Sequence, residues 1–139
     1  MKPRVNNSNA KKADRQMRYR RGHMAENMAA AILVLKGYRI LARRYRVGVG
    51  EVDLIAIRRD RVAFVEVKRR PTLEQAEQAM SARQRERIIR AAEQWLSRHP
   101  HYQHHEFGLD LMLLAPWRWP RHLPNAFHRP WYGNHETGY

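Results

Sequence analysis

The sequence predicts an α/β protein in which a mixed β-sheet is flanked by helices. Residues 23–36 and 81–98 have the composition and spacing of helices, whereas residues 38–70 hold three short runs of apolar, β-branched residues. A further run of this kind covers residues 107–115. The elements therefore follow the order α-β-β-β-α-β, which is typical of a mixed sheet with helices packed on it.

The first predicted helix covers residues 23–36 (HMAENMAAAILVLK), which are rich in strong helix formers. Gly37 follows directly and suits the left-handed position that ends many helices. The run YRILARRYRV predicts a strand over residues 38–47, and Gly48 and Gly50 mark the turn that follows it.

Residues 50–70 (GEVDLIAIRRDRVAFVEVKRR) predict a β-hairpin with its turn at residues 58–61. Both arms are rich in β-branched and aromatic residues. We place Ile57 opposite Val62 in an antiparallel register, which pairs the apolar residues of the two arms near the turn. A slip of one residue would move every side chain to the other face.

Four charged residues interrupt the far end of this hairpin. In the register above, Asp53 lies opposite Glu66. Because side chains alternate along a strand, these two residues and the other two charged residues share one face of the hairpin. Glu51 lies opposite Lys68 on the same face. Two opposed carboxylates next to apolar packing need a proton, a cation or a metal ion, and carboxylate oxygens suit Mg²⁺ or Mn²⁺. The spacing of these residues is also compatible with the alternative that they are an exposed strand end with an ordinary cross-strand Glu–Lys pair and no metal ion.

Two later segments begin with the capping-box pattern, TLEQ from Thr72 and SARQ from Ser81. The second opens a helix that stops near His99, with apolar residues at helical spacing opposite many arginines. These arginines form either a solvated helix face or a track for phosphates. They are Arg83, Arg85, Arg87 and Arg90. The run FGLDLMLLA then predicts a strand that ends at Pro116.

The charge balance points to a polyanionic partner. The 139 residues include 27 Lys and Arg against 13 Asp and Glu, a formal net charge of +14. This excess favours nucleic acid first and an anionic membrane surface second. The absence of cysteine excludes disulfides, thiolate metal sites and cysteine nucleophiles. With no apolar run of membrane-spanning length and no secretory signal, we expect a cytoplasmic location without membrane contact.

The length predicts one domain, which we place at residues 22–115. Residues 1–21 hold little that could pack, and we expect a disordered basic arm. Residues 116–139 form an extension rich in proline and aromatic residues. Four of its rings could stack on nucleic-acid bases, but we expect them to pack against the core. They are Trp117, Trp119, Trp131 and Tyr132.

The hairpin motif, Asp53 followed by Glu66-Val67-Lys68, resembles the PD-(D/E)xK nuclease signature. More narrowly, residues 22–115 resemble the uncharacterised YraN-like family, which is similar to archaeal Holliday-junction resolvases. The matching elements are Gly22, Glu26 and Ala29 in a Gly-x-x-x-Glu-x-x-Ala pattern, GYRIL at 37–41, GEVDLI at 50–55, FVEVKRR at 64–70, and FGLD with Asp110 in the Asp position. Arg44 stands where the family usually has Asn.

The resemblance implies a restriction-endonuclease-like fold and an Mg²⁺- or Mn²⁺-dependent endonuclease that acts on DNA, with branched or recombining DNA as a candidate substrate. By analogy it also implies a homodimer. A nucleic-acid-binding protein that keeps the fold without catalysis is the alternative.

The resemblance also implies roles for individual residues. Asp53, Glu66 and the Val67 carbonyl would bind the metal ion. Lys68 would position or help to deprotonate the attacking water, and Glu26 would reach in from the first helix. The accessory candidates are Glu51 and Asp110. The basic residues expected to bind nucleic acid are Arg69, Arg70, Arg83, Arg85 and Arg87.

Overall fold

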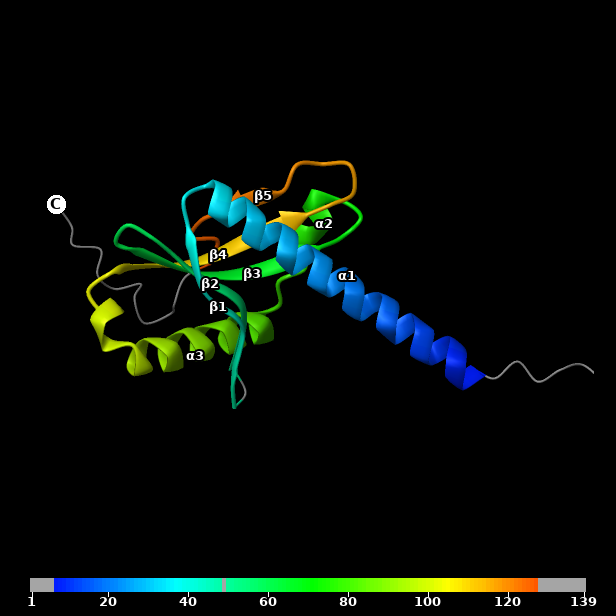
Figure 1. Ribbon diagram of the computed structural model, residues 1–139, viewed down its shortest axis with the longest axis horizontal. Helices are drawn as coiled ribbons and strands as arrows, with labels where there is room; N and C mark the ends of the chain where they lie inside the picture. Colours follow the sequence, from blue (N-terminus) through cyan, green and yellow to red (C-terminus); the bar gives the residue numbers. More distant parts are fainter. Residues whose placement is uncertain (1–6, 49, 128–139) are drawn as a thin grey trace, which may run out of the picture.

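Five strands form one mixed sheet in the order β1-β2-β3-β4-β5 in the computed structural model, which describes residues 7–48 and 50–127 (Figure 1). Strands β1, β2 and β3 form an antiparallel meander, β4 lies parallel to β3, and β5 lies antiparallel to β4. The strands are β1 (Arg39–Val47), β2 (Gly50–Arg58), β3 (Arg61–Arg69), β4 (Glu106–Leu114) and β5 (Arg121–Leu123).

Helices cover both faces of this sheet, with α1 on one face and α3 on the other (Figure 1). The helices are α1 (Asn7–Leu35), α2 (Leu73–Gln78), α3 (Ala82–Arg98) and the short 3₁₀ helix η1 (Pro100–Tyr102). The predicted α/β fold with a mixed sheet and flanking helices is therefore confirmed. The predicted order of elements is present, with α2, η1 and β5 added to it.

Side-chain alternation along the strands divides the core into two layers. On the α3 side, Trp95 meets Phe64 edge to face, with ring centroids 5.9 Å apart. On the α1 side, Leu33 packs with Leu54 and Val65, all fully buried. Because alternate residues of β3 serve opposite layers, Glu66 and Lys68 continue the α3-side row that includes Phe64.

Helix α1 ends as expected but begins much earlier. Gly37 has a φ of +92°, and Tyr38 N–H donates to Leu33 O over 2.9 Å, which is the Schellman ending. The helix starts at Asn7 rather than near residue 23. The expected disorder is therefore wrong for residues 7–21, since this segment has no Gly or Pro and extends a helix whose later turns are packed. Residues 1–6 lie outside the described residues.

The predicted hairpin register is confirmed near the turn, where Ile57 pairs with Val62 and Leu54 pairs with Val65. Arg59, at the turn, has a φ of +55°. Beyond Leu54 the backbone N–H of Val67 donates to a side chain, the Oδ2 atom of Asp53, over 2.8 Å. The hairpin thus places the Asp53 side chain against β3, at the end of the two strands that is far from the β2–β3 turn.

Helix α3 begins with the full capping box at Ser81, whereas Thr72 makes only its half of the predicted box at the start of α2. Gly50 fixes how closely β2 approaches α3. A Cβ atom at Gly50 would lie 2.8 Å from the backbone nitrogen of Ala91, so a larger residue would push the strand away. Because Gly50 has no side chain, the start of β2 packs closely on α3, and this position of the strand also positions Asp53.

Residues 121–123 of the C-terminal extension form β5 on the edge of the sheet. Three residues between prolines give too short a pattern to predict a strand. Residues 128–139, which include Trp131 and Tyr132, lie outside the described residues. Among the described helices, none combines the length and the apolar composition needed to cross a membrane.

Candidate metal centre

The structure brings Asp53 of β2 and Glu66 of β3 together, and their side chains share a hydrogen bond. Burial raises the pKa of Asp53, and the hydrogen bond from Val67 N–H opposes that rise. Burial also raises the pKa of Glu66 to about 8, and the neighbouring Asp53 charge adds to the effect. In the metal-free protein near neutral pH, Glu66 therefore holds a proton that a cation could replace.

Lys68 is buried, and its Nζ atom lies 3.3 Å from Oε1 of Glu66. The expected pairing of Lys68 with Glu51 is not present. Glu51 instead accepts hydrogen bonds from Arg46 over 3.2 Å and from Arg87 over 3.1 Å. Side chains two residues apart share a strand face, so Glu66 is the nearer carboxylate for Lys68. Glu51 remains beside the site, where its charge contributes to the raised pKa of Asp53.

Glu26 reaches the same region from α1, as expected. Its side chain is buried, and its Oε2 atom accepts a hydrogen bond from Nε of Arg44 over 2.5 Å. The other carboxylate oxygen, Oε1, is buried and has no hydrogen-bond partner among the described residues. A buried carboxylate oxygen without a partner is costly, so this atom is suited to accept a proton, a water or a metal ion.

Arg44 is a member of this cluster that the sequence did not predict. Arg43 pairs with Leu54 and Tyr45 pairs with Val52, so Arg44 lies across from Asp53. Its φ of +50° lies in the left-handed region. Asn adopts this conformation more readily than most residues do, so the Asn that the resemblance implies at this position would suit the same backbone. Pairing the predicted strand over residues 38–47 with the first arm of the hairpin would have placed Arg44 next to Asp53.

A groove of about 710 Å³ opens over these residues from the α1 side of the sheet. Glu26, Arg44 and Asp53 line this groove, as do the exposed residues Arg69 and Arg70. A smaller cavity of about 160 Å³ opens toward α3 and is lined by Asp53 together with Glu66, Glu51 and Arg87. Asp53 is therefore accessible from both sides of the sheet.

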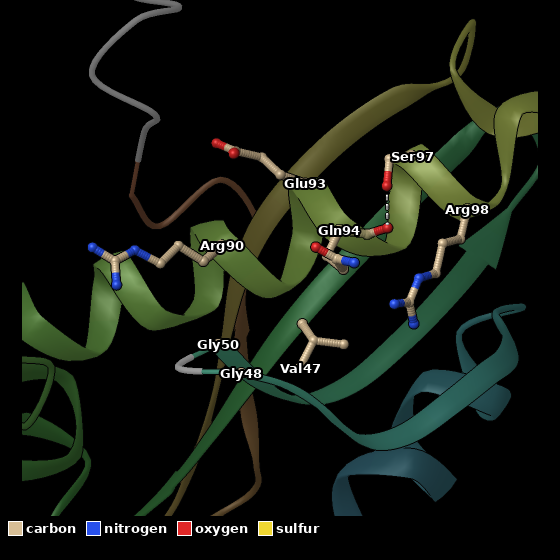
Figure 2. Close-up of a pocket in the computed structure, with 8 residues that line it drawn as sticks. All are labelled: Val47, Gly48, Gly50, Arg90, Glu93, Gln94, Ser97 and Arg98. Carbon is tan, nitrogen blue, oxygen red and sulfur yellow. Dashed lines mark hydrogen bonds between the residues drawn. The ribbon is translucent and has the colours of Figure 1, made fainter.

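The predicted arginines on α3 differ in what they contact. Arg83 and Arg85 are exposed. Arg87 is held by Glu51 and so connects the helix to the site. Arg90 lies 4.0 Å from Glu86 and, with Arg98, borders a separate cavity of about 720 Å³ between α3 and the β1–β2 turn (Figure 2).

Asp110, an accessory candidate, lies elsewhere. It is fully buried, and its carboxylate accepts hydrogen bonds from two nitrogens of Arg61 over 2.7 and 2.9 Å and from Nε2 of His122 over 2.8 Å. Burial alone would raise its pKa, but the bonds from His122 and Arg61 hold the pKa of Asp110 below its usual range. Arg61 lies on the face of β3 opposite Glu66, so the sheet separates the two clusters. Gly108 leaves room for the Arg61 guanidinium.

The donor set can be compared with the needs of a hard divalent cation. Within residues 7–48 and 50–127, no three His, Cys, Asp or Glu side chains form a group that could hold a metal ion by themselves. Mg²⁺, however, keeps several waters and is commonly bound through one or two carboxylates. The paired carboxylates of Asp53 and Glu66 and the unpartnered oxygen of Glu26 fit that requirement.

The chain is similar to one family of known proteins. A family model described as "Uncharacterised protein family UPF0102" matches residues 25–114. A UPF0102 protein of Mesorhizobium japonicum is 53% identical over 116 residues, which cover 84% of this chain and 93% of the relative. One of Nitrobacter winogradskyi is 54% identical over 106 residues (76% and 90%), and one of Methylorubrum extorquens is 51% identical over 115 residues (83% and 90%). These names state no activity, and the matches confirm the resemblance to an uncharacterised family.

Proposed function

This chain belongs to the uncharacterised protein family UPF0102, and we propose that it is a metal-dependent endonuclease that hydrolyses phosphodiester bonds in DNA. The single observation that carries the proposal is the arrangement of Asp53, Glu66 and Lys68. Two carboxylates share a hydrogen bond, a buried lysine lies 3.3 Å from one of them, both carboxylates line the smaller cavity toward α3, and Asp53 also lines the groove. Perturbed carboxylates in a groove, with a cation beside them, are typical of catalytic sites.

Asp53, Glu66 and the Val67 carbonyl would hold an Mg²⁺ or Mn²⁺ ion. When bound, the ion lowers the pKa of a water molecule and neutralises charge on the scissile phosphate. Glu66 would release its proton to solvent as the cation binds, and its carboxylate would then face both the ion and Lys68. Lys68 would then orient the attacking water and stabilise negative charge on the phosphate. Glu26 would contribute its unpartnered oxygen, directly or through a water.

The basic surface would hold the nucleic-acid backbone around this centre. Arg69 and Arg70 line the groove, while Arg83 and Arg85 are exposed on α3. A net charge of +14 gives strong, salt-dependent attraction to phosphates of any sequence. DNA with branches or recombination intermediates is a candidate substrate.

A homodimer is the assembly that we propose, because α1 presents an apolar strip to solvent. Met17, Met24, Met28 and Leu35 are at least half exposed and repeat along the helix at intervals of seven and four residues. This spacing is that of a seam between two helices, and a second copy of α1 would cover it. Light scattering should report a dimer, and Met24→Lys together with Met28→Lys should yield a monomer.

The rival function is a nucleic-acid-binding protein without catalysis. One observation favours it: the described residues contain no ready group of three metal-ligating side chains. The basic surface would bind backbone phosphates equally well without any metal ion.

A cleavage assay separates the two functions. Linear, flapped and four-way DNA should be incubated with Mg²⁺ or Mn²⁺ and with the wild type, Asp53→Asn, Glu66→Gln or Lys68→Ala. Glu77→Gln on α2 is the matched control, because Glu77 is exposed and lies outside the site. Cleavage by the wild type and the control alone supports the nuclease. Binding by every protein with cleavage by none supports the rival.

A further inference from the structure

The loop between β4 and β5 carries two tryptophan side chains that nothing in the described fold covers. Trp117 is fully exposed and Trp119 is 88% exposed. The expectation that these two rings pack against the core is therefore wrong. A packed tryptophan buries a large apolar surface that stabilises the fold, and here neither ring does so. Two such rings, with one residue between them, leave apolar surface available to a ligand.

The backbone of this loop holds the rings in a costly conformation. Arg118 N–H reaches the Ala115 carbonyl over 3.4 Å, Pro116 follows Ala115, and Trp117 has a φ of +61°. These are the features of a type II turn, in which the third position favours Gly or Asn. A bulky residue is strained there, and strain of this kind concentrates at functional sites. Neither burial of its ring nor the backbone conformation at this position therefore explains why position 117 is a tryptophan.

The loop lies beside the candidate metal centre. Leu113 pairs with Lys68 in the parallel β3–β4 ladder, and Arg70 N–H donates to Leu114 O over 3.1 Å. The loop starts directly after Leu114. A cavity of about 590 Å³ at the loop is lined by Trp119 and shares Pro71 and Pro116 with the groove over Asp53. A strand that leaves the groove past these prolines would reach the two rings.

The charges around the rings match a nucleic-acid strand. Arg118, between the two tryptophans, and Arg121 line this cavity against one acid, Glu74, and Arg69 and Arg70 line the adjoining groove. Indole rings stack on bases without regard to sequence, and arginines hold the phosphates between them. Bases within a duplex are already stacked on each other, so only unpaired bases present free faces to the rings.

We propose that Trp117 and Trp119 form a stacking platform for unpaired bases next to the candidate metal centre. The preferred ligand is then DNA with a single-stranded segment, such as a flap, a gap or a splayed arm, rather than a continuous duplex. The inference rests on the proposed function, because it names the substrate class of the same groove.

Binding measured without divalent metal tests the platform independently of cleavage. Short oligo-dT and a duplex of the same length should be titrated in the presence of EDTA against the wild-type chain, Trp117→Ala, Trp119→Ala and the double variant. Loss of one stacking ring should lower single-strand affinity by roughly 5- to 150-fold, with duplex affinity nearly unchanged. Phenylalanine at both positions should restore most of the loss, because a stacking face remains.

Two control variants isolate the effect of the rings. Val34→Ala shortens an apolar side chain that is 56% exposed on α1 and is not part of the proposed dimer strip, so it should change neither affinity. Arg118→Ala should weaken single strands and duplexes alike and reduce the salt dependence of both. Far-UV circular dichroism and melting temperature would show that the double alanine variant is folded.

The outcomes are distinct for the platform and for the nuclease. Selective loss of single-strand affinity supports the platform even if neither the wild type nor any variant cleaves DNA, in which case only the proposed nuclease function fails. Equal loss on both ligands, or no loss on either, overturns the platform. A blue shift of tryptophan emission with phosphatidylglycerol vesicles but not with oligo-dT also overturns it, because the rings would then serve a lipid surface.

Discussion

Replacing Glu66 with glutamine is expected to stabilise the metal-free protein above neutral pH. Glutamine resembles the protonated form of this side chain, and the folded protein keeps that proton up to a pKa of about 8. In the unfolded chain Glu66 ionises near its usual pKa of 4.5. The folded state therefore loses stability as the pH rises from about 4.5 to about 8, and the whole loss is present above that window.

The magnitude follows from the difference between these two pKa values, which already includes the favourable Lys68 ion pair. At about 1.4 kcal/mol per pKa unit, the ionised side chain costs the fold up to about 5 kcal/mol. With local relaxation and water entry, we expect Glu66→Gln to raise the free energy of unfolding by about 2 to 5 kcal/mol at about pH 9 and by little at about pH 5.

Urea unfolding in EDTA at both pH values measures this difference. Glu77→Gln should leave the pH dependence of the wild type unchanged, because its side chain is exposed. A Glu66→Gln protein that is less stable than the wild type at about pH 9 would contradict this expectation. It would mean that the ion pair with Lys68 outweighs the burial of the charge and the repulsion from Asp53.

Three further results are expected. Lys68→Ala should eliminate cleavage while DNA affinity falls only slightly, because one cation among many contributes little to binding; a loss of affinity that matches the loss of rate would place Lys68 in the docking surface. Deletion of residues 1–21 should weaken binding to all nucleic acids and reduce the salt slope by roughly 0.9 per lost phosphate contact, while cleavage at saturating DNA persists because Glu26 remains; an unchanged slope would show that this segment does not touch the backbone. Asp110→Asn should lower the free energy of unfolding by about 3 to 5 kcal/mol, since it leaves Arg61 without its buried partner, and should leave Mn²⁺ affinity unchanged; undiminished stability in a chemical melt would show that the Arg61 pair is dispensable.

The parts of the fold that depend on local pattern could be predicted from the sequence. Apolar alternation in the two arms fixed the pairing of Ile57 with Val62, because any slip would expose the buried row. Gly37 and Ser81 marked helix ends through chemistry that acts over a few residues. The meeting of Asp53 and Glu66 followed from that register.

The parts that depend on contacts distant in sequence could not be predicted. Glu51 binds Arg87, which is 36 residues away, and Asp110 binds Arg61, which is 49 residues away. No periodicity within one element reports such pairs. The early start of α1 could not be predicted, because a polar helix and a disordered segment can have the same charged composition.

Exposure of Trp117 was also beyond the sequence. A proline-rich segment with aromatic residues is compatible both with rings that pack on a core and with rings that face solvent. The difference depends on where the β4–β5 loop leaves the sheet, and the short strand β5 sets that path.

Calorimetric titration with Mn²⁺ is the sharpest check on the candidate metal centre, because it detects the ion proposed at Asp53 and Glu66 without requiring a substrate. We predict binding by the wild type and by Glu77→Gln, and loss of binding in Asp53→Asn and Glu66→Gln, both of which thermal melts should show to be folded. Unchanged Mn²⁺ affinity in both site variants would mean that these two carboxylates do not hold the ion.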